Sequence, residues 1–166
     1  MSHGFALEKV EVSLTPQQRF EEFLQSRGKR NTGPRRTIVD QVFSHHEHFD
    51  ADELLAQLAA NPAGRKVSRP TVYRTLTEMV DAGLLREMPL AGRRVYEHDY
   101  GYPQHDHLFC QKCKALIEFS NDEVKEIREA VARQHQFRET GHRLIIFGTC
   151  AECSKPKRRH RPLDLI

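Results

Sequence analysis

The chain has 166 residues, enough for one large domain or two small ones, with a formal charge of +3, 30% charged residues and 38% hydrophobic residues. This composition is typical of a water-soluble globular protein, and the mild positive charge permits a nucleic-acid partner without requiring one. No apolar run approaches the roughly 20 residues of a membrane span, and no secretory leader pattern stands at the N-terminus. The sequence therefore excludes a membrane protein and predicts a cytoplasmic one.

The N-terminal half contains no cysteine and carries its apolar residues at helical spacing. Capping residues and breakers around these stretches predict four helices. They are Pro16–Ser26, a helix that follows residues 29–36 and ends near Phe43, a helix capped by Asp50 and stopped at residues 61–62, and a helix capped by Ser68 and ended by Gly83.

Two short strands are expected next, at residues 84–88 and 93–97, around a turn at residues 89–92. Three of these four helices, followed by the two-stranded hairpin, make a winged helix-turn-helix. The sequence thus predicts a winged helix-turn-helix domain over residues 1–97.

The fourth helix is expected to turn a polar face away from this core. That face carries Arg69, Thr71, Tyr73, Arg74 and Thr75. Arginine can bond two acceptors on guanine, and a threonine methyl or a tyrosine ring can touch the thymine methyl. Because the second helix of a helix-turn-helix enters the major groove, this face is predicted to read double-stranded DNA.

Residues 29–36 form a basic loop with four positive charges and no acid among them. Arg30 is placed to reach the minor groove, and Arg35 and Arg36 to contact phosphates. A charge run by itself is as often a solvated face. Together with the helix order and the hairpin, however, the loop favours DNA binding.

After residue 97 the pattern becomes more strand-like. Strands are predicted at residues 107–110, 115–119 and 142–147, with a helix from Asn121 or Asp122 to about Gln134. Val124, Ile127 and Val131 are expected to face inward from that helix. Residues 98–154 thus form a small α/β domain, residues 155–166 a basic tail, and the fold class is α+β.

Two CxxC pairs, Cys110/Cys113 and Cys150/Cys153, hold all four cysteines. In a reducing compartment such pairs indicate a metal site rather than disulfides. Four thiolates close a tetrahedral zinc site with no open position, so this zinc is expected to be structural. The alternatives are four unligated cysteines or a redox dithiol, which would need a CxxC at a helix start in a βαβ context.

A second ligand cluster precedes the first pair. On an extended strand alternate residues point the same way, so His105 and His107 can share one ion while Asp106 faces the other side. Glu97 and Glu118 can reach the same region. Imidazole and carboxylate ligands suit Fe(II), Mn(II), Zn(II) or Co(II), and affinity order alone does not select iron.

These residues together resemble the ferric uptake regulator family of metal-dependent transcriptional repressors, over roughly residues 16–153. The segments that carry the resemblance are TVYRTL at residues 71–76, DAGL at 81–84, HDHLFCQKC at 105–113, LIEF at 116–119 and CAEC at 150–153. The resemblance implies a homodimer joined through the C-terminal domains, with each winged helix reading one half of a palindromic operator. Metal loading would close the dimer onto promoters of metal uptake genes.

The resemblance also assigns residues to roles. Tyr73 and Arg74 match the family's base-reading pair, and Arg30 falls at its minor-groove position. The regulatory metal site of the family matches His48, Glu97, His105, His107 and Glu118. His48 stands in the DNA-binding half, so a metal held by this set would fix the relative orientation of the two domains.

A further metal site of the family is altered in this chain. Asp106 and His142 remain, but Gln104 replaces a histidine and Lys125 stands where a carboxylate is expected. A protonated lysine cannot ligate a cation and repels it. The segment at residues 99–104 is also one residue longer than the family pattern.

The resemblance implies structural zinc and regulatory Fe(II), with Mn or Zn as other regulatory metals. Glu97 and Glu118 stand where peroxide sensors of the family have aspartates, and no extra cysteine is available for a zinc sensor. A zinc-uptake regulator and a peroxide-responsive regulator are the alternatives within the family. Outside it, the alternatives are a zinc-dependent hydrolase using His105, His107 and Glu97, and a constitutive DNA-binding module with structural zinc only.

Overall fold

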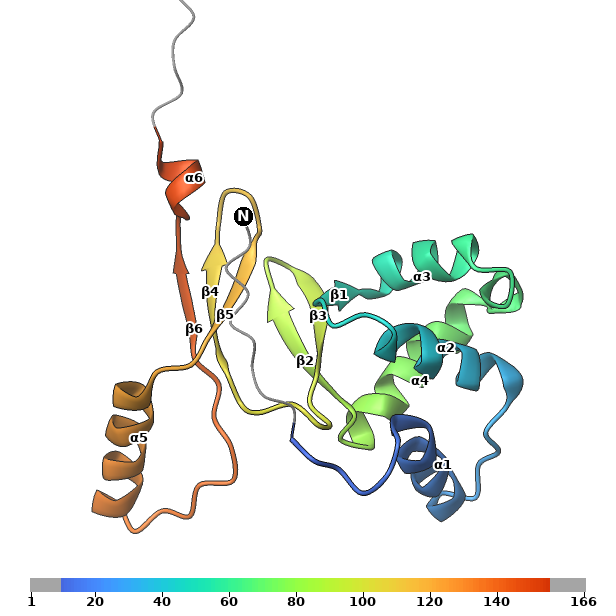
Figure 1. Cartoon of the computed structure of the whole chain (residues 1–166), viewed down its shortest axis with the longest axis horizontal. Coiled ribbons are helices and arrows are strands. Elements are labelled where there is room, and N and C mark those ends of the chain that lie inside the picture. Colours follow the sequence, from blue (N-terminus) through green and yellow to red (C-terminus); the bar gives the residue numbers. More distant parts are fainter. Residues whose placement is uncertain (1–9, 156–166) are drawn as a thin grey trace, which may run out of the picture. The chain divides into compact units, whose positions relative to one another are not determined.

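The computed structural model describes residues 10–155, which form two compact units that divide between Gln104 and His105 (Figure 1). The sequence placed the division earlier, after Glu97. The segment that follows Glu97 belongs to the first unit because its backbone bonds there. Asp99 N donates to Leu84 O at 3.1 Å, and Gly101 O accepts from Val10 N at 3.1 Å.

The first unit contains the four predicted helices. They are α1 (Pro16–Ser26), α2 (Gly33–Phe43), α3 (Ala51–Ala60) and α4 (Arg69–Asp81), with a short 3-10 helix at Gly64–Lys66. Reciprocal capping boxes begin α1, between Thr15 and Gln18, and α3, between Asp50 and Glu53. One prediction is corrected: the last four residues of the basic segment, residues 33–36, form the first turn of α2 and are not loop.

The hairpin of the first unit is longer than the sequence predicted. Its strands are β2 (Leu85–Leu90) and β3 (Arg93–His98), which pair antiparallel, and β1 (Phe49–Asp50) adds a third strand beside β3. The turn is only Ala91-Gly92, both with positive φ (49° and 79°), so Pro89 and Leu90 lie in β2 and not in the turn. A tight two-residue turn with both φ positive matches the twist of the paired strands.

The core of the first unit is built from apolar side chains of all four helices and the hairpin. Its fully buried members include Phe20, Leu24, Ile38, Leu54, Leu58, Val72, Leu76, Met79, Leu84 and Tyr96. The apolar spacing of the helices therefore predicted the buried faces correctly. This core fixes α4 against the other helices and leaves its opposite face to solvent.

The second unit is a three-stranded sheet with two helices. Its strands are β4 (Asp106–Cys110), β5 (Leu116–Phe119) and β6 (Ile145–Gly148), and its helices are α5 (Asp122–Gln134) and α6 (Ala151–Ser154). The sheet order is β5-β4-β6, with β5 antiparallel and β6 parallel to β4. β6 begins at Ile145 rather than at residue 142, and most of the predicted basic tail lies outside the described residues.

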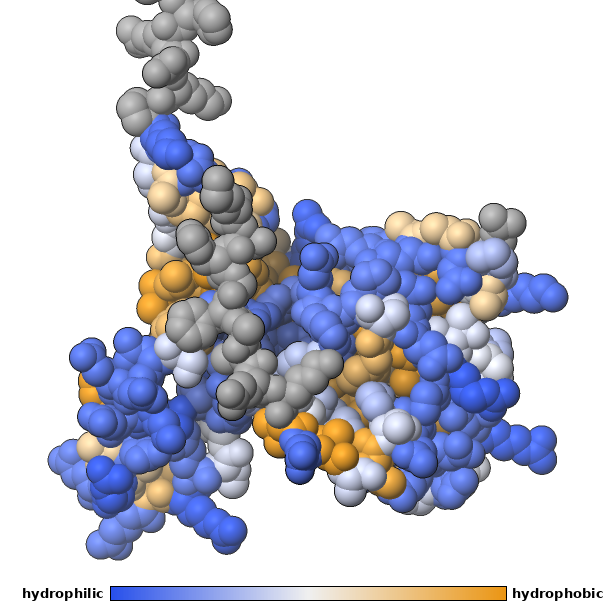
Figure 2. Space-filling view, viewed as in Figure 1, coloured by the Kyte–Doolittle hydropathy of each residue, from blue (hydrophilic) through white to orange (hydrophobic). Residues whose placement is uncertain are grey.

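The apolar face of α5 does not face inward as the sequence predicted. No residue of α5 is buried, and Ile127 and Val131 are 66% and 51% exposed. Leu108 of β4 pairs with Ile117 of β5 and Ile146 of β6, and all three are also exposed. Figure 2 shows hydrophobic residues gathered over β6. A contiguous exposed apolar surface of this kind marks a place where another molecule packs.

None of the described helices combines the length and apolar character that crossing a membrane requires.

Candidate metal centres and DNA-reading face

The four cysteines of the second unit lie together. Cys110 ends β4, Cys113 follows in the adjoining turn, Cys150 precedes α6 and Cys153 lies within it. Their sulfurs all lie within 4.8 Å of one another, and those of Cys113 and Cys150 are 3.7 Å apart. Sulfurs on a tetrahedron around zinc are about 3.8 Å apart when each Zn–S bond is about 2.3 Å. The spacing fits zinc and is far too long for a disulfide.

Backbone hydrogen-bond donors favour the thiolate form of Cys110. The amide of Cys150 donates to Cys110 Sγ at 3.3 Å. Hydrogen bonds from this amide and from those of Cys113 and Lys112 lower the pKa of Cys110 to about 6. Hydrogen bonds from Cys153 to the sulfurs of Cys150 and Cys113 raise the pKa of its own thiol to about 12. Zinc must displace that proton when it binds.

The second cluster of the second unit consists of His105, His107 and Glu118. His107 of β4 stands directly opposite Glu118 of β5, and His105 immediately precedes β4. The two imidazole centroids are 4.8 Å apart, and His105 Nε2 is 3.7 Å from Glu118 Oε1. Their donor atoms all lie within 4.8 Å of one another. Two imidazoles and a carboxylate at this spacing fit one divalent transition-metal ion.

Asp106 serves a different set of contacts, as the strand alternation predicted. Its Oδ1 lies 2.9 Å from His142 Nε2. The histidine in turn lies against Arg128 of α5, whose Nη1 is 2.5 Å from His142 Nδ1. Lys125, named from the sequence, is exposed, and Gln104 belongs to the first unit. These residues do not fit a third metal ion, because the guanidinium of Arg128 lies against the ring nitrogens of His142, which would have to bind the ion.

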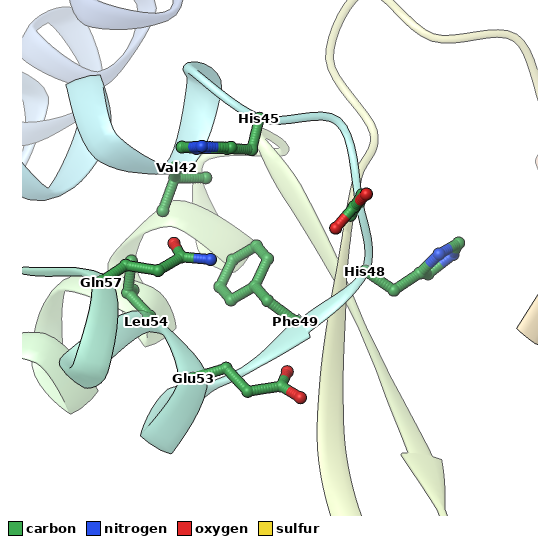
Figure 3. Close-up of a pocket in the computed structure, with 8 residues that line it drawn as sticks. Val42, His45, His48, Phe49, Glu53, Leu54 and Gln57 are labelled. Carbon is green, nitrogen blue, oxygen red and sulfur yellow. The ribbon is translucent and has the colours of Figure 1, made fainter. Parts of the chain in front are cut away.

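His48 and Glu97, the predicted ligands from the first unit, lie side by side. His48 follows α2, Glu97 lies on β3, and their Nε2 and Oε2 atoms are 3.3 Å apart. His48 stands at the rim of a cavity of about 240 Å³, and its imidazole points away from Leu54 at the cavity's apolar side (Figure 3). The cavity is lined by Val42, His45, Glu47, His48, Phe49, Glu53, Leu54 and Gln57.

The exposed face of α4 agrees with the prediction at four of five positions. Tyr73 is 42% exposed, Arg69 and Arg74 are exposed, and Thr71 is half-buried. The prediction that Thr75 lies on the exposed face is wrong, because Thr75 is fully buried. It stands three residues after Val72 and four before Met79, which places it on the core side of the helix.

Arg69 and Arg35, both predicted to contact DNA, pair with acidic side chains of the protein. Arg69 pairs with Asp52 of α3, and its guanidinium lies 5.8 Å from the Tyr73 ring centroid. Arg35 pairs with Glu78 of α4, with Nη2 2.9 Å from Oε1. Arg30 remains exposed. Sequence reasoning missed Glu78, because its partner Arg35 stands 43 residues away and no local pattern joins the two.

Comparisons with known proteins give one answer. Residues 26–147 match the model of the ferric uptake regulator family. The ferric uptake regulation protein of Neisseria meningitidis serogroup A is 33% identical over 138 residues, which cover 82% of this chain and 94% of that protein.

Two solved structures are similar as well. The Vibrio cholerae ferric uptake regulator superposes with a TM-score of 0.66 and 31% identity, covering 78% of this chain and 98% of that one. The Helicobacter pylori regulator, whose structure is described as revealing three functional metal binding sites, shares the fold with a TM-score of 0.79 at 21% identity, covering 91% of this chain and 99% of that one. This chain therefore belongs to the ferric uptake regulator family of metal-responsive transcriptional repressors, which bind operator DNA as dimers.

Proposed function

We propose that this chain represses transcription when one exchangeable divalent ion, Fe(II) in the cell, is held by ligands from both units. Each unit carries an incomplete set of donors. The first brings His48 and Glu97, and the second brings His105, His107 and Glu118. The observation that carries the proposal is the three-donor cluster of the second unit, which leaves coordination positions for further ligands.

A shared ion would make metal concentration control DNA binding. A ligand shifts a conformational equilibrium only by its different affinity for the two states. An ion that needs both donor sets binds more tightly when the units are arranged to bring them together. Metal would thus select one orientation of the DNA-reading units in the dimer, and its loss would release that orientation.

The choice of iron rests on the donors. Imidazole and carboxylate oxygen are shared by Fe(II), Mn(II) and Zn(II). Glu97 and Glu118 stand where the family's peroxide sensors carry aspartates, and the four cysteines are already gathered around the proposed structural zinc site. Iron is therefore the favoured regulatory metal, and manganese and zinc are the competitors.

DNA recognition is assigned to α4 and the basic segment at residues 29–36. Tyr73 and Arg74 would read bases in the major groove, with Thr71 and Arg69 beside them. Arg30 would reach the adjacent minor groove, and Arg36 a phosphate. A symmetric dimer then requires a palindromic operator, and such a protein works in the cytoplasm, where its DNA is.

A zinc-dependent hydrolase is the competing function. It needs a zinc ion with an open position, a general base and a substrate pocket. It leaves the exposed aromatic and basic face of α4 without a role. Zinc-dependent hydrolysis of ester or phosphate substrates, abolished by His107→Ala, would favour the enzyme.

The test is operator affinity at fixed salt, measured anaerobically with and without Fe(II) or Mn(II), because salt alone changes the affinity steeply. We expect metal to raise the affinity by about 5- to 150-fold, the usual range of coupling between two sites. His107→Ala in the second unit and Glu97→Ala in the first should each remove the effect. His135→Ala, at an exposed position after α5, is the control. Unchanged affinity with metal would identify a constitutive DNA-binding module.

A further inference from the structure

We infer that Arg128 supplies, as a permanent cation, what a third metal ion would supply in the second unit, so this chain ties α5 to β4 without metal. The inference is independent of the regulatory site proposed above. It rests on a four-residue network, here named the arginine lock, that joins α5, β4 and the segment between α5 and β6. Its members are Asp106, Arg128, Glu139 and His142.

The arginine lock has the donors of a metal site with a guanidinium among them. Arg128 Nη1 lies 2.5 Å from Nδ1 and 2.9 Å from Nε2 of His142. Arg128 Nε lies 2.6 Å from Glu139 Oε1, and His142 Nε2 lies 2.9 Å from Asp106 Oδ1. The side chains of Asp106 and His142 are only 6% and 15% exposed. The carboxylate of Glu139 and the imidazole of His142 thus contact a cation that the chain itself provides, and Asp106 joins the network through His142.

His142 connects the acidic and basic members of the lock, because it contacts both Asp106 and Arg128. A carboxylate can only accept, so His142 Nε2 must carry the proton that it shares with Asp106. The guanidinium of Arg128, which can only donate, lies against both ring nitrogens of His142. Every charged group in the lock has an opposite charge or a hydrogen-bond partner, as buried charges require.

A metal ion cannot enter this arrangement. An ion about 2.0–2.1 Å from a histidine nitrogen needs that nitrogen's lone pair. Arg128 Nη1 lies within 2.9 Å of both ring nitrogens of His142, and the guanidinium does not lose its proton in proteins. Among the described residues, the groups of three or more clustered donors are the four cysteines and the set around His105 and His107, and the arginine lock forms no such group.

The position of Asp106 links the arginine lock to the strand that carries the regulatory ligands. Asp106 lies between His105 and His107 in sequence. Its carboxylate contacts His142 on the opposite side of the strand from the two histidines. The lock therefore keeps α5 attached to the strand that presents the regulatory ligands, whatever the metal supply. In a protein of this fold with a metal at this place, the attachment would depend on metal. Here it depends on an arginine.

The inference predicts a latent metal site that Arg128 blocks. In the Arg128→Ala variant, the side chains of Glu139 and His142 are released from the guanidinium and can close with Asp106 around a zinc ion completed by water. Zinc per folded chain, counted by mass spectrometry after titration with zinc alone, should rise by one over the unsubstituted protein. The difference between the two proteins is the readout, so it does not depend on whether the regulatory site itself binds zinc.

Two control variants and one replacement variant accompany the zinc count. Arg133→Ala removes another arginine of α5, exposed and paired with Glu129, and should leave the count unchanged. Arg128→Ala/His142→Ala should lose the extra ion again. Arg128→Gln, which keeps length and polarity, replaces the alanine variant if that variant does not fold.

The unsubstituted protein gives a second readout. Its His142 imidazole resonances should not move in an NMR titration with zinc. An extra zinc at His142 in the unsubstituted protein, or no gain of zinc in a folded Arg128 variant, would overturn the inference.

Discussion

Glu78 of α4 binds Arg35 of α2 through both of its carboxylate oxygens. Arg35 Nε is 3.1 Å from Oε2 and Nη2 is 2.9 Å from Oε1, while Lys29 Nζ lies 2.8 Å from the same Oε1. Arg35 also donates through Nη1 to the carbonyl of Arg30 at 2.6 Å. A carboxylate on α4, with its side chain 10% exposed, thus positions the basic segment.

This arrangement predicts that Glu78→Gln weakens specific DNA binding although it adds positive charge. Without the carboxylate, Lys29 and Arg35 are released to phosphates, so nonspecific binding should tighten and its salt dependence steepen. Arg30 loses its fixed place, so specific affinity should fall about tenfold, or about 1.4 kcal/mol.

The specific and the nonspecific affinity are both measured as a function of salt concentration, with operator DNA and with random DNA. Asp81→Asn, the same charge change at an exposed end of α4, is the control. A uniform gain on both DNAs would show that Glu78 only lowers the charge.

Arg74→Ala tests base reading by α4. Arg74 is exposed on the face opposite the core, with Nε 3.4 Å from Pro70 O. If Arg74 bonds a base edge, its loss should cost about 1–3 kcal/mol of specific binding and relax specificity at one position of the operator. The measurement is competition between operator variants at constant salt. An equal loss on random DNA would instead assign Arg74 to a phosphate.

Ile146→Glu tests the exposed row on the sheet of the second unit as the dimer interface. Ile146 pairs with Leu108, which also pairs with Ile117. A charge in the centre of an apolar interface should weaken dimerisation by about 2 kcal/mol, or roughly 30-fold. Sedimentation equilibrium measures the change, and Ser120→Glu, exposed in the same unit, is the matched control. Unchanged dimerisation would place the interface elsewhere.

His98 should make the first unit less stable in mild acid. Burial lowers its pKa from 6.5 to about 4, while its Nε2 donates to Val42 O at 3.0 Å. The unfolded chain therefore takes up a proton near pH 6.5 that the folded chain refuses until about pH 4. Stability is complete above pH 6.5 and falls as the pH drops to 4, by at most about 3 kcal/mol.

His98→Gln keeps a donor for Val42 O and does not titrate, so this part of the pH dependence should vanish. Hydrogen exchange of core amides in α1 and α4 follows the first unit separately from the zinc-binding unit. Parallel pH profiles for the two proteins would contradict the assignment. Any constant offset between the profiles reports lost packing against Phe43, whose ring centroid lies 4.8 Å from that of His98.

Local chemistry made much of this protein predictable from its sequence. The helices followed from caps and apolar spacing, because both act within a few residues of the chain. The CxxC spacing predicted four clustered sulfurs, and the alternation of a strand predicted that His105 and His107 turn away from Asp106. Each of these relations depends on backbone geometry over a short stretch, which residue identity largely determines.

Only the tertiary structure decided which charges meet. Glu78 and Arg35 stand 43 residues apart and Asp106 and His142 stand 36 apart, so no local pattern joins them. The sequence pointed to Lys125 as the residue opposing a third metal, whereas the fold brings Arg128, one helical turn later, against His142. Long-range pairing depends on how helices and strands pack, and packing selects among partners that the sequence offers equally.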